Sequence, residues 1–592
     1  MKNIIYPFDP MQIMKKRRSL KKSLFAGKKE FAEKKIAILG GSTTSDIKDT
    51  LEVFLLDAGI TPFFYESGYN SYYEESMFDN PSLSDFAPDI IYLHVTIENI
   101  KQKPLLTDSE DTIKSKIAAV FTEVQNICEN LLVRYNASII INNFAFPDVQ
   151  YLGNIDSIDI HGYNRFVTKI NQLIYDYARD NNRIFLNDIC YLSARIGLDK
   201  WYDRDFWYSY KMAVSYECIP ELAYNICKII KASLGKSKKC LVLDLDNTLW
   251  GGTIGDDGME GIKIGKETPS GEAYTAFQQY ILGLKEKGVI LAVCSKNDLQ
   301  IAKEGFLHPD TVLKIDDFAA FEANWDEKYL NIIKIAEKIN IGLDSVVFVD
   351  DNPVERMNVR TNLPEVAVPE INGDDVSSYV KILDQSGYFE QINVSEEDLK
   401  RTRSYHENAQ RQELQKQFVS YDDFLRSLDM KAEIKPFSSI YMDRIAQLVN
   451  KTNQFNLTSK RYTLKELDDI ACDPSYLTLY GRLKDKFGDN GLISVIIGRK
   501  SNDILHIELW LMSCRVIKRD MEKAMFDILL KTGKDSGIEK IIGHYYKTNR
   551  NAMVKDLYKN LGFCLADENI DGSVWEYDLK ENKRPEHHIH LG

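Results

Sequence analysis

Two aspartates one residue apart stand where an apolar stretch of the chain ends. Residues 238–252 are KKCLVLDLDNTLWGG, in which Asp244 and Asp246 follow Leu241, Val242 and Leu243. Aspartate is a poor strand residue. In a strand over 240–246, alternation places both carboxylates on the same side of its end, where the ligand crevice of an open α/β sheet lies. This segment therefore predicts a parallel-sheet fold with a chemical site at the strand ends.

Two close carboxylates repel each other unless a cation or a shared proton lies between them. Mg²⁺ supplies such a cation through hard oxygen ligands, and a carboxylate that stays ionised can attack phosphorus. A phosphoryl site also needs donors for the phosphate oxygens, a fixed cation and further acidic groups on the metal. The sequence offers Thr248, Ser295 in VCSKN, Lys328 in NWDEKYLNI, and Asp350 with Asp351 in FVDDN.

D-x-D-x-T, then Ser, then Lys, then D-D, each at a strand end, resembles the haloacid dehalogenase (HAD) superfamily. The resemblance implies that Asp244 is the nucleophile and Asp246 the acid/base, whose backbone carbonyl also meets the metal. It further implies that Ser295 and Thr248 hold phosphate and that Lys328 neutralises it. Asp351 would ligate Mg²⁺ together with Asp244, with Asp350 beside it.

Four longer stretches narrow the resemblance to the FkbH-like family. They are LDLDNTLWGGTIGDDG, CSKND, NIGLDSVVFVDDNPVER and LWLMSCRV, and the match extends over about 240–580. The resemblance implies transfer of a glyceryl-type unit from the acyl phosphate 1,3-bisphosphoglycerate to the thiol of an acyl carrier protein. A transient thioester could form on Cys294, beside Ser295, or on Cys514 in SCRV; the alternative for each is a buried structural cysteine.

The C-terminal part, about 430–580, resembles the GNAT acyltransferase fold through SCRVIKRDMEKAMFDILL and NRNAMVKDLYKNLGF. In that fold a helix N-terminus binds the pyrophosphate of coenzyme A or a pantetheine arm. The loop that begins at Arg515 lacks both of the small residues that let backbone N–H groups approach phosphate. Arg515, Asn551 and Tyr558 are the candidates for a carrier-protein pantetheine contact, and a structural or docking module is the alternative.

The N-terminal part, about 34–235, resembles an SGNH-hydrolase-like sheet. Ser42 in GGSTTSD would be its nucleophile, and NNF over 142–144 would hold the oxyanion-hole asparagine. The family's G-D-S is G-G-S here, and no histidine occurs in YDRDFWYSYKM over 202–212. A serine without a base is a weak nucleophile, so we expect a non-catalytic relative that docks a partner or an acyl chain.

The whole chain is expected to be a multidomain α/β protein with an SGNH-like α/β sheet, a Rossmann-like HAD domain and an α+β GNAT-like domain. The expected segments are a basic N-terminal segment over 1–33, the SGNH-like domain over 34–235, the HAD-like domain over 236–390, a connecting helix over 391–429, the GNAT-like domain over 430–580 and a disordered tail over 581–592. The basic run KKRRSLKK at 15–22 is expected to be a solvated helix face or an interaction arm.

Bulk properties limit the partners of the chain. Its 592 residues carry a net charge of −13, which does not favour nucleic-acid binding. Nine scattered cysteines without a CxxC motif indicate free thiols in a reducing cytoplasm, and no apolar run is long enough to predict a membrane span. Two other functions stay open: a phosphatase for a small phosphorylated metabolite, and a non-enzymatic scaffold of a biosynthetic complex.

Overall fold

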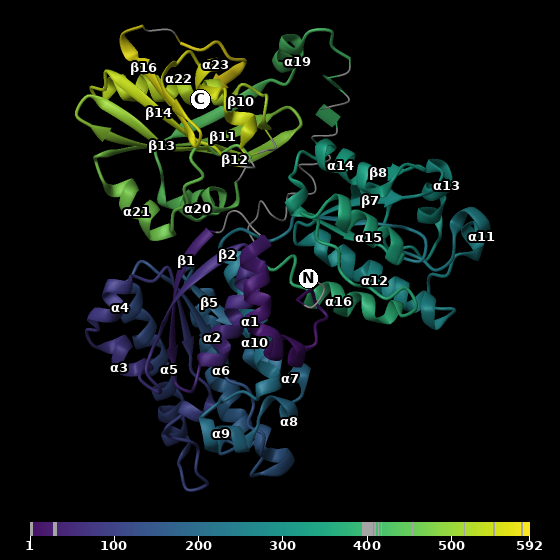
Figure 1. Ribbon diagram of the computed structural model, residues 1–592, viewed down its shortest axis with the longest axis vertical. Helices are drawn as coiled ribbons and strands as arrows, with labels where there is room; N and C mark the ends of the chain where they lie inside the picture. Colours follow the sequence, from purple (N-terminus) through teal and green to yellow (C-terminus); the bar gives the residue numbers. More distant parts are fainter. Residues whose placement is uncertain are drawn as a thin grey trace. The chain divides into compact units, whose positions relative to one another are not determined.

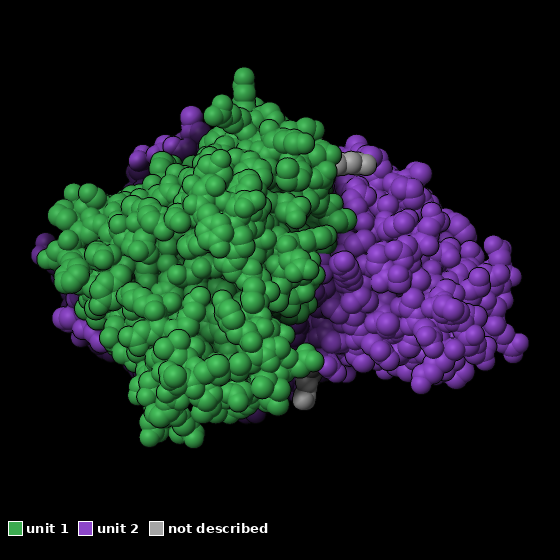
Figure 2. All heavy atoms as spheres, turned by 90° about the horizontal axis from the view of Figure 1, so that it is seen from below, with its two compact units in different colours: residues 1–233 green, residues 234–592 purple. Residues whose placement is uncertain are grey.

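The computed structural model describes residues 4–27, 32–392, 407, 410–411, 414–415, 417–452, 454–513, 516–548, 551–581 and 584–592. The chain divides into two compact units, residues 1–233 and residues 234–592, which are coloured separately in Figure 2. The multidomain α/β class expected from the sequence is confirmed, because three separate sheets form, two of them wholly parallel.

The first unit is built on a parallel five-stranded sheet with the order β2-β1-β3-β4-β5 (Figure 1). Its strands are β1 Ala32–Gly40, β2 Ile60–Glu66, β3 Ile90–His94, β4 Ser138–Asn142 and β5 Ile184–Asn187. Helices α5 Glu110–Arg134 and α6 Tyr163–Arg179 pack on one face. Helix α2 Ser45–Asp57 contacts both α10 Ile219–Ser233 and α1 Pro10–Gly27. The apolar stretches of the sequence thus become buried parallel strands, as expected.

The basic run at 15–22 lies within α1 and is partly tied to the fold. Arg17 Nη1 donates to Asp46 Oδ1 over 2.6 Å, and Lys21 pairs with Glu52, so both cations meet carboxylates of α2. This helix packs on α2 and α10, so it is part of the first unit and not a free arm.

The second unit begins with a parallel four-stranded sheet of order β8-β7-β6-β9. Its strands are β6 Cys240–Leu243, β7 Ile290–Ser295, β8 Phe318–Ala323 and β9 Val346–Val349. Alternate residues of β6 face opposite sides: Leu241 and Leu243 pack with α12 Pro269–Glu286, while Cys240 and Val242 pack with α14 Lys328–Lys338. The strand predicted over 240–246 ends at Leu243, so both aspartates lie in the loop beyond it.

The last sheet has eight strands in the order β15-β16-β14-β13-β12-β11-β10-β17. Its strands are β10 Met430–Lys435, β11 Tyr476–Asp485, β12 Gly488–Ser501, β13 Ile504–Met512, β14 Lys540–Tyr546, β15 Cys564–Asn569, β16 Gly572–Asp578 and β17 Ile589–Leu591. Helix α22 Met521–Asp535 packs on one face, and α20 Met442–Lys451 with α21 Leu464–Cys472 packs on the other. The hairpin expected around KSND is confirmed as β12 and β13, and its turn has Asn502 at φ 55.

The tail expected to be disordered over 581–592 instead contains strand β17 Ile589–Leu591. It pairs in parallel with β10, with Met430 opposite Ile589. Ile589 is buried, and His588 Nδ1 lies 2.9 Å from Asp520 Oδ2. The open edge of β10 gives the tail backbone partners and Ile589 gives it an apolar anchor, so the expectation of disorder is wrong here.

The connecting helix expected over 391–429 lies largely outside the described residues; its described C-terminal part includes α19 Tyr421–Ser427. Within the described parts of the chain, every helix is too short or too polar to cross a bilayer.

Candidate active site

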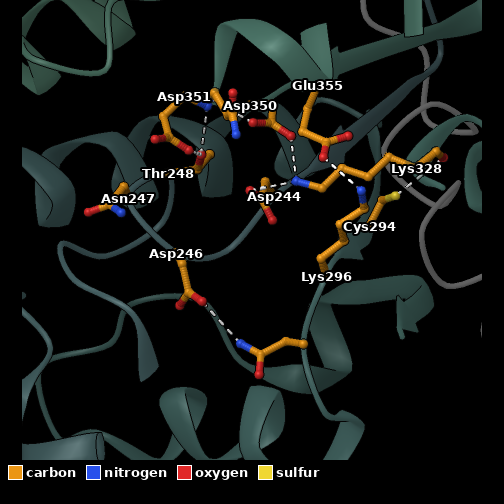
Figure 3. A network of polar contacts seen from close by, with 12 residues as sticks. Asp244, Asp246, Asn247, Thr248, Cys294, Lys296, Lys328, Asp350, Asp351 and Glu355 are labelled. Atoms are coloured by element: carbon orange, nitrogen blue, oxygen red, sulfur yellow. Dashed lines mark hydrogen bonds and ion pairs between the residues drawn. The ribbon is translucent and has the colours of Figure 1, made fainter. Parts of the chain in front are cut away.

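The predicted site residues gather at the carboxyl edge of the four-stranded sheet. Asp244 directly follows β6, and Asp350 with Asp351 directly follows β9, the neighbour of β6. Lys328 is the first residue of α14, which follows β8. Figure 3 shows the side chains of these residues converging from separate segments. The topology thus brings together groups that are more than 100 residues apart in the sequence.

Lys328 is the buried cation of the site. Its Nζ lies 2.8 Å from Asp244 Oδ2 and 2.5 Å from Asp350 Oδ2, and the residue is only 3% exposed. Burial disfavours the ammonium form, but the charges of Asp244 and Asp350 outweigh it and raise the pKa of Lys328 above its usual value. The lysine therefore stays charged between two carboxylates.

Three carboxylates meet around this lysine. One oxygen each from Asp244, Asp350 and Asp351 lies within 4.8 Å of the others, a set that could hold a metal ion. Burial, followed by the charge of Asp244, raises the pKa of both Asp350 and Asp351. Two buried carboxylates and one half-buried carboxylate near one lysine leave excess negative charge, which a divalent cation with a preference for hard oxygen ligands would balance.

Thr248 is hydrogen-bonded to Asp351. Its fully buried hydroxyl donates to Asp351 Oδ1 over 3.4 Å and accepts from the Asp351 backbone N–H over 3.2 Å. Arg356, one turn into helix α15 Pro353–Asn362, donates to the carbonyls of Asp350 and Asp351 over 2.9 and 2.6 Å. These contacts orient the two aspartates that follow β9.

The carboxylate of Asp246 points away from the group around Lys328 (Figure 3). It accepts hydrogen bonds from Trp250 Nε1 over 2.9 Å, from the Ile254 backbone N–H over 3.0 Å and from Asn297 Nδ2 over 3.1 Å. Burial raises the pKa of Asp246, although the hydrogen bonds from Ile254 and Trp250 oppose the shift. The expected sharing of one strand face by Asp244 and Asp246 is wrong, because the strand ends before both residues.

Trp250 and Asn297 were not singled out from the sequence. Trp250 stands four residues after Asp246, in the loop where Asn247 has φ 54 and accepts from the Gly252 backbone N–H. Asn297 belongs to the CSKND motif that follows β7, so the end of the neighbouring strand was the available signal.

Cys294 and Ser295 are adjacent in β7 and therefore face opposite ways. The Cys294 side chain lies in the apolar cluster with Val242 and Ile332, and burial raises the pKa of its thiol. Ser295 is the last residue of β7, at the carboxyl edge beside β6. The structure contradicts a thioester on Cys294, because its thiol is enclosed in the core.

The other thiol candidate, Cys514, and the pantetheine candidate Arg515 lie outside the described residues. Among the described cysteines, Cys472 and Cys564 are exposed. They lie on α21 and β15 of the C-terminal sheet and not among the residues of the aspartate site.

Asn551 and Tyr558 are both buried and serve the structure of the C-terminal sheet. Asn551 Nδ2 donates to the carbonyls of Asn456 and Tyr546, each over 2.9 Å, and its Oδ1 accepts from the Thr548 backbone N–H over 2.8 Å. The Tyr558 ring packs against Trp510 and Phe563. Neither side chain is presented to a pantetheine arm, so these two predictions are wrong in this structure.

The N-terminal sheet encloses the residues singled out for an esterase-like site. Ser42 is 2% exposed. Asn142 accepts from Tyr92 and from Asn187, and Asn143 donates to Asp188 over 2.6 Å. The side-chain amides of Asn142 and Asn143 are therefore already hydrogen-bonded within the fold.

Comparisons with known proteins locate the chain among its relatives. A family model described as the FkbH N-terminal domain matches residues 35–231. The N-terminal part of the protein BF1531 from Bacteroides fragilis, whose crystal structure is described as containing a phosphatase domain complexed with Mg, is 31% identical. The match covers 64% of this chain and 99% of that one, with a TM-score of 0.59.

Two acetyltransferase structures match smaller parts. The ribosomal-protein-S18-alanine N-acetyltransferase of Escherichia coli is 12% identical over 24% of this chain and 90% of that one, with a TM-score of 0.20. The PaiA N-acetyltransferase of Thermoplasma acidophilum is 15% identical over 25% of this chain and 99% of that one, with a TM-score of 0.19. None of the curated proteins compared with the chain matched it.

A parallel sheet that delivers an aspartate after its central strand, two more after the next strand and a lysine from a helix start is the framework of a HAD-type enzyme. The likeness to the BF1531 structure extends over nearly all of that relative, and the N-terminal residues match the FkbH domain. The chain belongs to the FkbH-like family.

Proposed function

We propose that this protein is a Mg²⁺-dependent transferase that loads a glyceryl-type unit from 1,3-bisphosphoglycerate onto the thiol of an acyl carrier protein. The observation that carries the proposal is the group formed by Asp244, Asp350, Asp351 and Lys328, which leaves a nucleophilic carboxylate beside a cation site. Membership of the FkbH-like family supports the carrier protein as the partner.

The residues present fit Mg²⁺. Asp244, Asp350 and Asp351 offer oxygen ligands within 4.8 Å of one another, and the relative from Bacteroides fragilis is described as complexed with Mg. Magnesium is bound by a few carboxylates and otherwise by water and phosphate oxygens. When bound, Mg²⁺ would neutralise phosphate charge and polarise the phosphoryl group.

The other roles in the reaction are assigned to side chains of the protein. Lys328 and Ser295, at the same edge of the sheet, hold the phosphate charge, as the sequence predicted. Asp244, whose carboxylate lies 2.8 Å from the Lys328 ammonium, is the nucleophile toward phosphorus. Asp246, oriented by Trp250 and Asn297, is the group that gives a proton to the leaving oxygen and takes one from the attacking water.

Both phosphates of 1,3-bisphosphoglycerate must leave if a glyceryl unit is to remain. In the first step the carrier thiolate attacks the acyl carbon, a C–S bond forms, and the C–O bond to phosphate breaks. In the second step Asp244 takes the C3 phosphoryl group, and Asp246 protonates the released hydroxyl. Water then attacks the aspartyl-phosphate and frees inorganic phosphate, which restores the Asp244 carboxylate.

A plain phosphatase is the second candidate. The description of the Bacteroides fragilis relative as containing a phosphatase domain favours it.

The test is incubation with Mg²⁺, 1,3-bisphosphoglycerate and candidate carrier proteins, followed by intact mass spectrometry of the carriers. A mass gain of one glyceryl unit supports the transferase. Free phosphate with unmodified carriers supports the phosphatase. If neither a modified carrier nor free phosphate forms, and calorimetry detects no Mg²⁺ binding, the remaining function is that of a non-enzymatic scaffold.

The division into an SGNH-like part over 34–235, a HAD-like part over 236–390 and a GNAT-like part over 430–580 belongs to the same proposal. The three separate sheets support it. The enclosure of Ser42 supports a non-catalytic role for the first part.

Thr248→Val is expected to weaken Mg²⁺ binding by about ten- to a hundredfold, because a hydrogen bond that orients a metal-ligating carboxylate is lost. Valine keeps the shape of the buried threonine, so the fold should persist. Calorimetric titration with Mg²⁺ measures the effect, and Thr361→Val on the exposed face of α15 is the matched control. Equal affinity in the two variants would remove Asp351 from the ligand set.

Mg²⁺ affinity is expected to fall as the pH falls from about 8 to about 6. Burial and the charge of Asp244 raise the pKa values of Asp350 and Asp351, so these groups take up protons at a higher pH than exposed aspartates. Because only the ionised carboxylates bind the metal, each proton bound competes with Mg²⁺. Calorimetry in buffers of different ionisation enthalpy would detect the protons released; pH-independent affinity would contradict the assignment.

A further inference from the structure

In the C-terminal sheet, strands β13 and β14 are paired over only part of their length. They run in parallel from Ile504 opposite Lys540 to Ile507 opposite Gly543, and the pairing ends there. Beyond this point a segment from the loop between α20 and α21, residues 455–458, lies between the two strands.

Hydrogen bonds join this inserted segment to both strands. On the β13 side, the Met512 N–H donates to the Phe455 carbonyl over 3.0 Å and the Leu457 N–H donates to the Trp510 carbonyl over 3.1 Å. On the β14 side, the Tyr546 N–H donates to the Leu457 carbonyl over 2.9 Å. The backbone N–H and carbonyl groups that an extended ligand would bind in this gap are thus already hydrogen-bonded to residues of the chain itself.

The inserted segment is also fully enclosed. Asn456 and Leu457 are 0% exposed. The Thr458 hydroxyl donates to the Glu508 carbonyl over 2.7 Å, and Asn551 holds the Asn456 carbonyl. A pantetheine arm therefore cannot enter between β13 and β14 unless residues 455–458 leave, so any ligand of this sheet binds elsewhere.

A polar cavity of about 420 Å³ lies where β13 and β14 begin to separate, with Thr458 of the inserted segment in its wall. The groups that give it its charge come from the 455–463 loop and from β12, β13 and β14: Lys460, Arg499, Lys500, His506, Glu508 and His544. Three of these side chains are permanently cationic and one is anionic, in a chain whose net charge is −13.

The single carboxylate of the cavity is already engaged. Glu508 Oε2 lies 3.4 Å from Lys460 Nζ and accepts from the Tyr462 hydroxyl over 3.3 Å. No carboxylate of a described residue forms an ion pair with Lys500 or lies within 4.0 Å of the Arg499 guanidinium. Arg499 and Lys500 are adjacent in β12 and therefore face opposite ways. Arg499 lies opposite His506, whereas Lys500 lies opposite the buried Leu505, so among the described residues Arg499 is the cation without an ion-pair partner on the side of the sheet that carries the two imidazoles.

Two imidazoles form another side of the cavity. The rings of His506 and His544 stack with their centroids 5.8 Å apart, and His506 Nδ1 lies 3.5 Å from His544 Nε2. Burial, then His506 and Lys460, lowers the pKa of His544. An anion in the cavity would accept from these nitrogens and from the Arg499 guanidinium.

We propose that this cavity is a phosphate-binding site, separate from the aspartate site, that takes a small phosphate ester. Oxygen acceptors of a phosphate match the donors of a lysine, an arginine and an imidazole pair. The ester could come from two sources, a free phosphorylated acid or the phosphate of a pantetheine arm lying outside the closed gap. The site does not depend on the transfer reaction proposed above.

The test is calorimetric titration of the full chain in buffer containing EDTA, which keeps Mg²⁺ from the aspartate site. Inorganic phosphate, 3-phosphoglycerate and phosphopantetheine are the three probes. The double variant Arg499→Gln/His544→Gln is expected to bind phosphate at least about tenfold more weakly, since charge-assisted hydrogen bonds are lost. Lys531→Gln, an exposed lysine on α22, is the matched control and should bind like the parent chain.

Asp244→Asn separates the two sites. Phosphate binding that persists in this variant and is lost in the double variant supports the proposal. Binding that is absent in EDTA, or that the double variant retains, overturns it. Tighter binding of phosphopantetheine than of the other two probes assigns the carrier arm as the source, and the reverse order assigns a free phosphorylated acid. Equal melting temperatures in phosphate-free buffer establish that the variants are folded.

Discussion

Asp244→Asn is expected to lower turnover by at least about a thousandfold while the fold stays intact. The amide keeps the size of the side chain but cannot act as a nucleophile toward phosphorus. Lys328 loses one partner but keeps Asp350 at 2.5 Å, so its charge is still compensated. Removal of the Asp244 charge also relieves the repulsion that helps to raise the pKa values of Asp350 and Asp351.

The effect is measured as phosphate release and as carrier mass under single-turnover conditions. If transfer and dephosphorylation are separate steps, the variant should accumulate a phosphoglyceryl carrier, because thiol attack on the acyl carbon does not need the Asp244 nucleophile. Circular dichroism and the melting temperature are the controls for folding. Turnover at the parent rate would mean that the nucleophile is another residue.

Lys328→Met is expected to lower the free energy of unfolding by about 3–5 kcal/mol in Mg²⁺-free buffer. The substitution leaves the buried carboxylates of Asp244 and Asp350 without the cation that lies between them, with the half-buried Asp351 nearby. The pKa values of Asp350 and Asp351, already raised, would rise further in the folded state. The loss of stability is therefore largest above those pKa values, and it diminishes as the pH falls and the carboxylates take up protons.

Urea unfolding with and without Mg²⁺ measures this effect. Added Mg²⁺ should restore part of the lost stability, because the ion binds only the folded site. Lys296→Met is the matched control: Lys296 pairs with Glu355 over 2.9 Å but its side chain is 31% exposed, so the change should be within about 1 kcal/mol. Similar losses in the two variants would show that Lys328 is not the central cation.

The convergence of the site could be predicted from the sequence because each participant marks the end of an element. Asp244 and Asp351 follow apolar runs that can only be buried parallel strands, and such strands end at a common edge. Lys328 opens a helix with apolar residues at helical spacing. At these positions the local sequence pattern and the sheet topology predict the same placement of the side chain, so that placement can be predicted from the sequence.

Other positions depend on contacts that local pattern does not contain. Strand β6 ends at Leu243, so the Asp246 carboxylate turns toward Trp250 and Asn297. Asn297 lies 51 residues further along the chain than Asp246. The thioester predicted on Cys294 could have been rejected from the sequence, because side chains alternate along β7 and Cys294 therefore faces away from Ser295. The insertion of residues 455–458 between β13 and β14 arises from tertiary hydrogen bonds and has no periodic signature.

The distribution of thiols has a consequence for chemical labelling. Of the cysteines in the described parts of the chain, Cys472 and Cys564 are exposed, whereas Cys240 and Cys294 are enclosed beneath the sheet that carries the aspartates. Brief treatment of the native protein with an alkylating reagent would therefore modify Cys472 and Cys564 first among these described cysteines. The aspartate centre would retain its chemistry after such labelling, and maleimide dyes could be attached without blocking it.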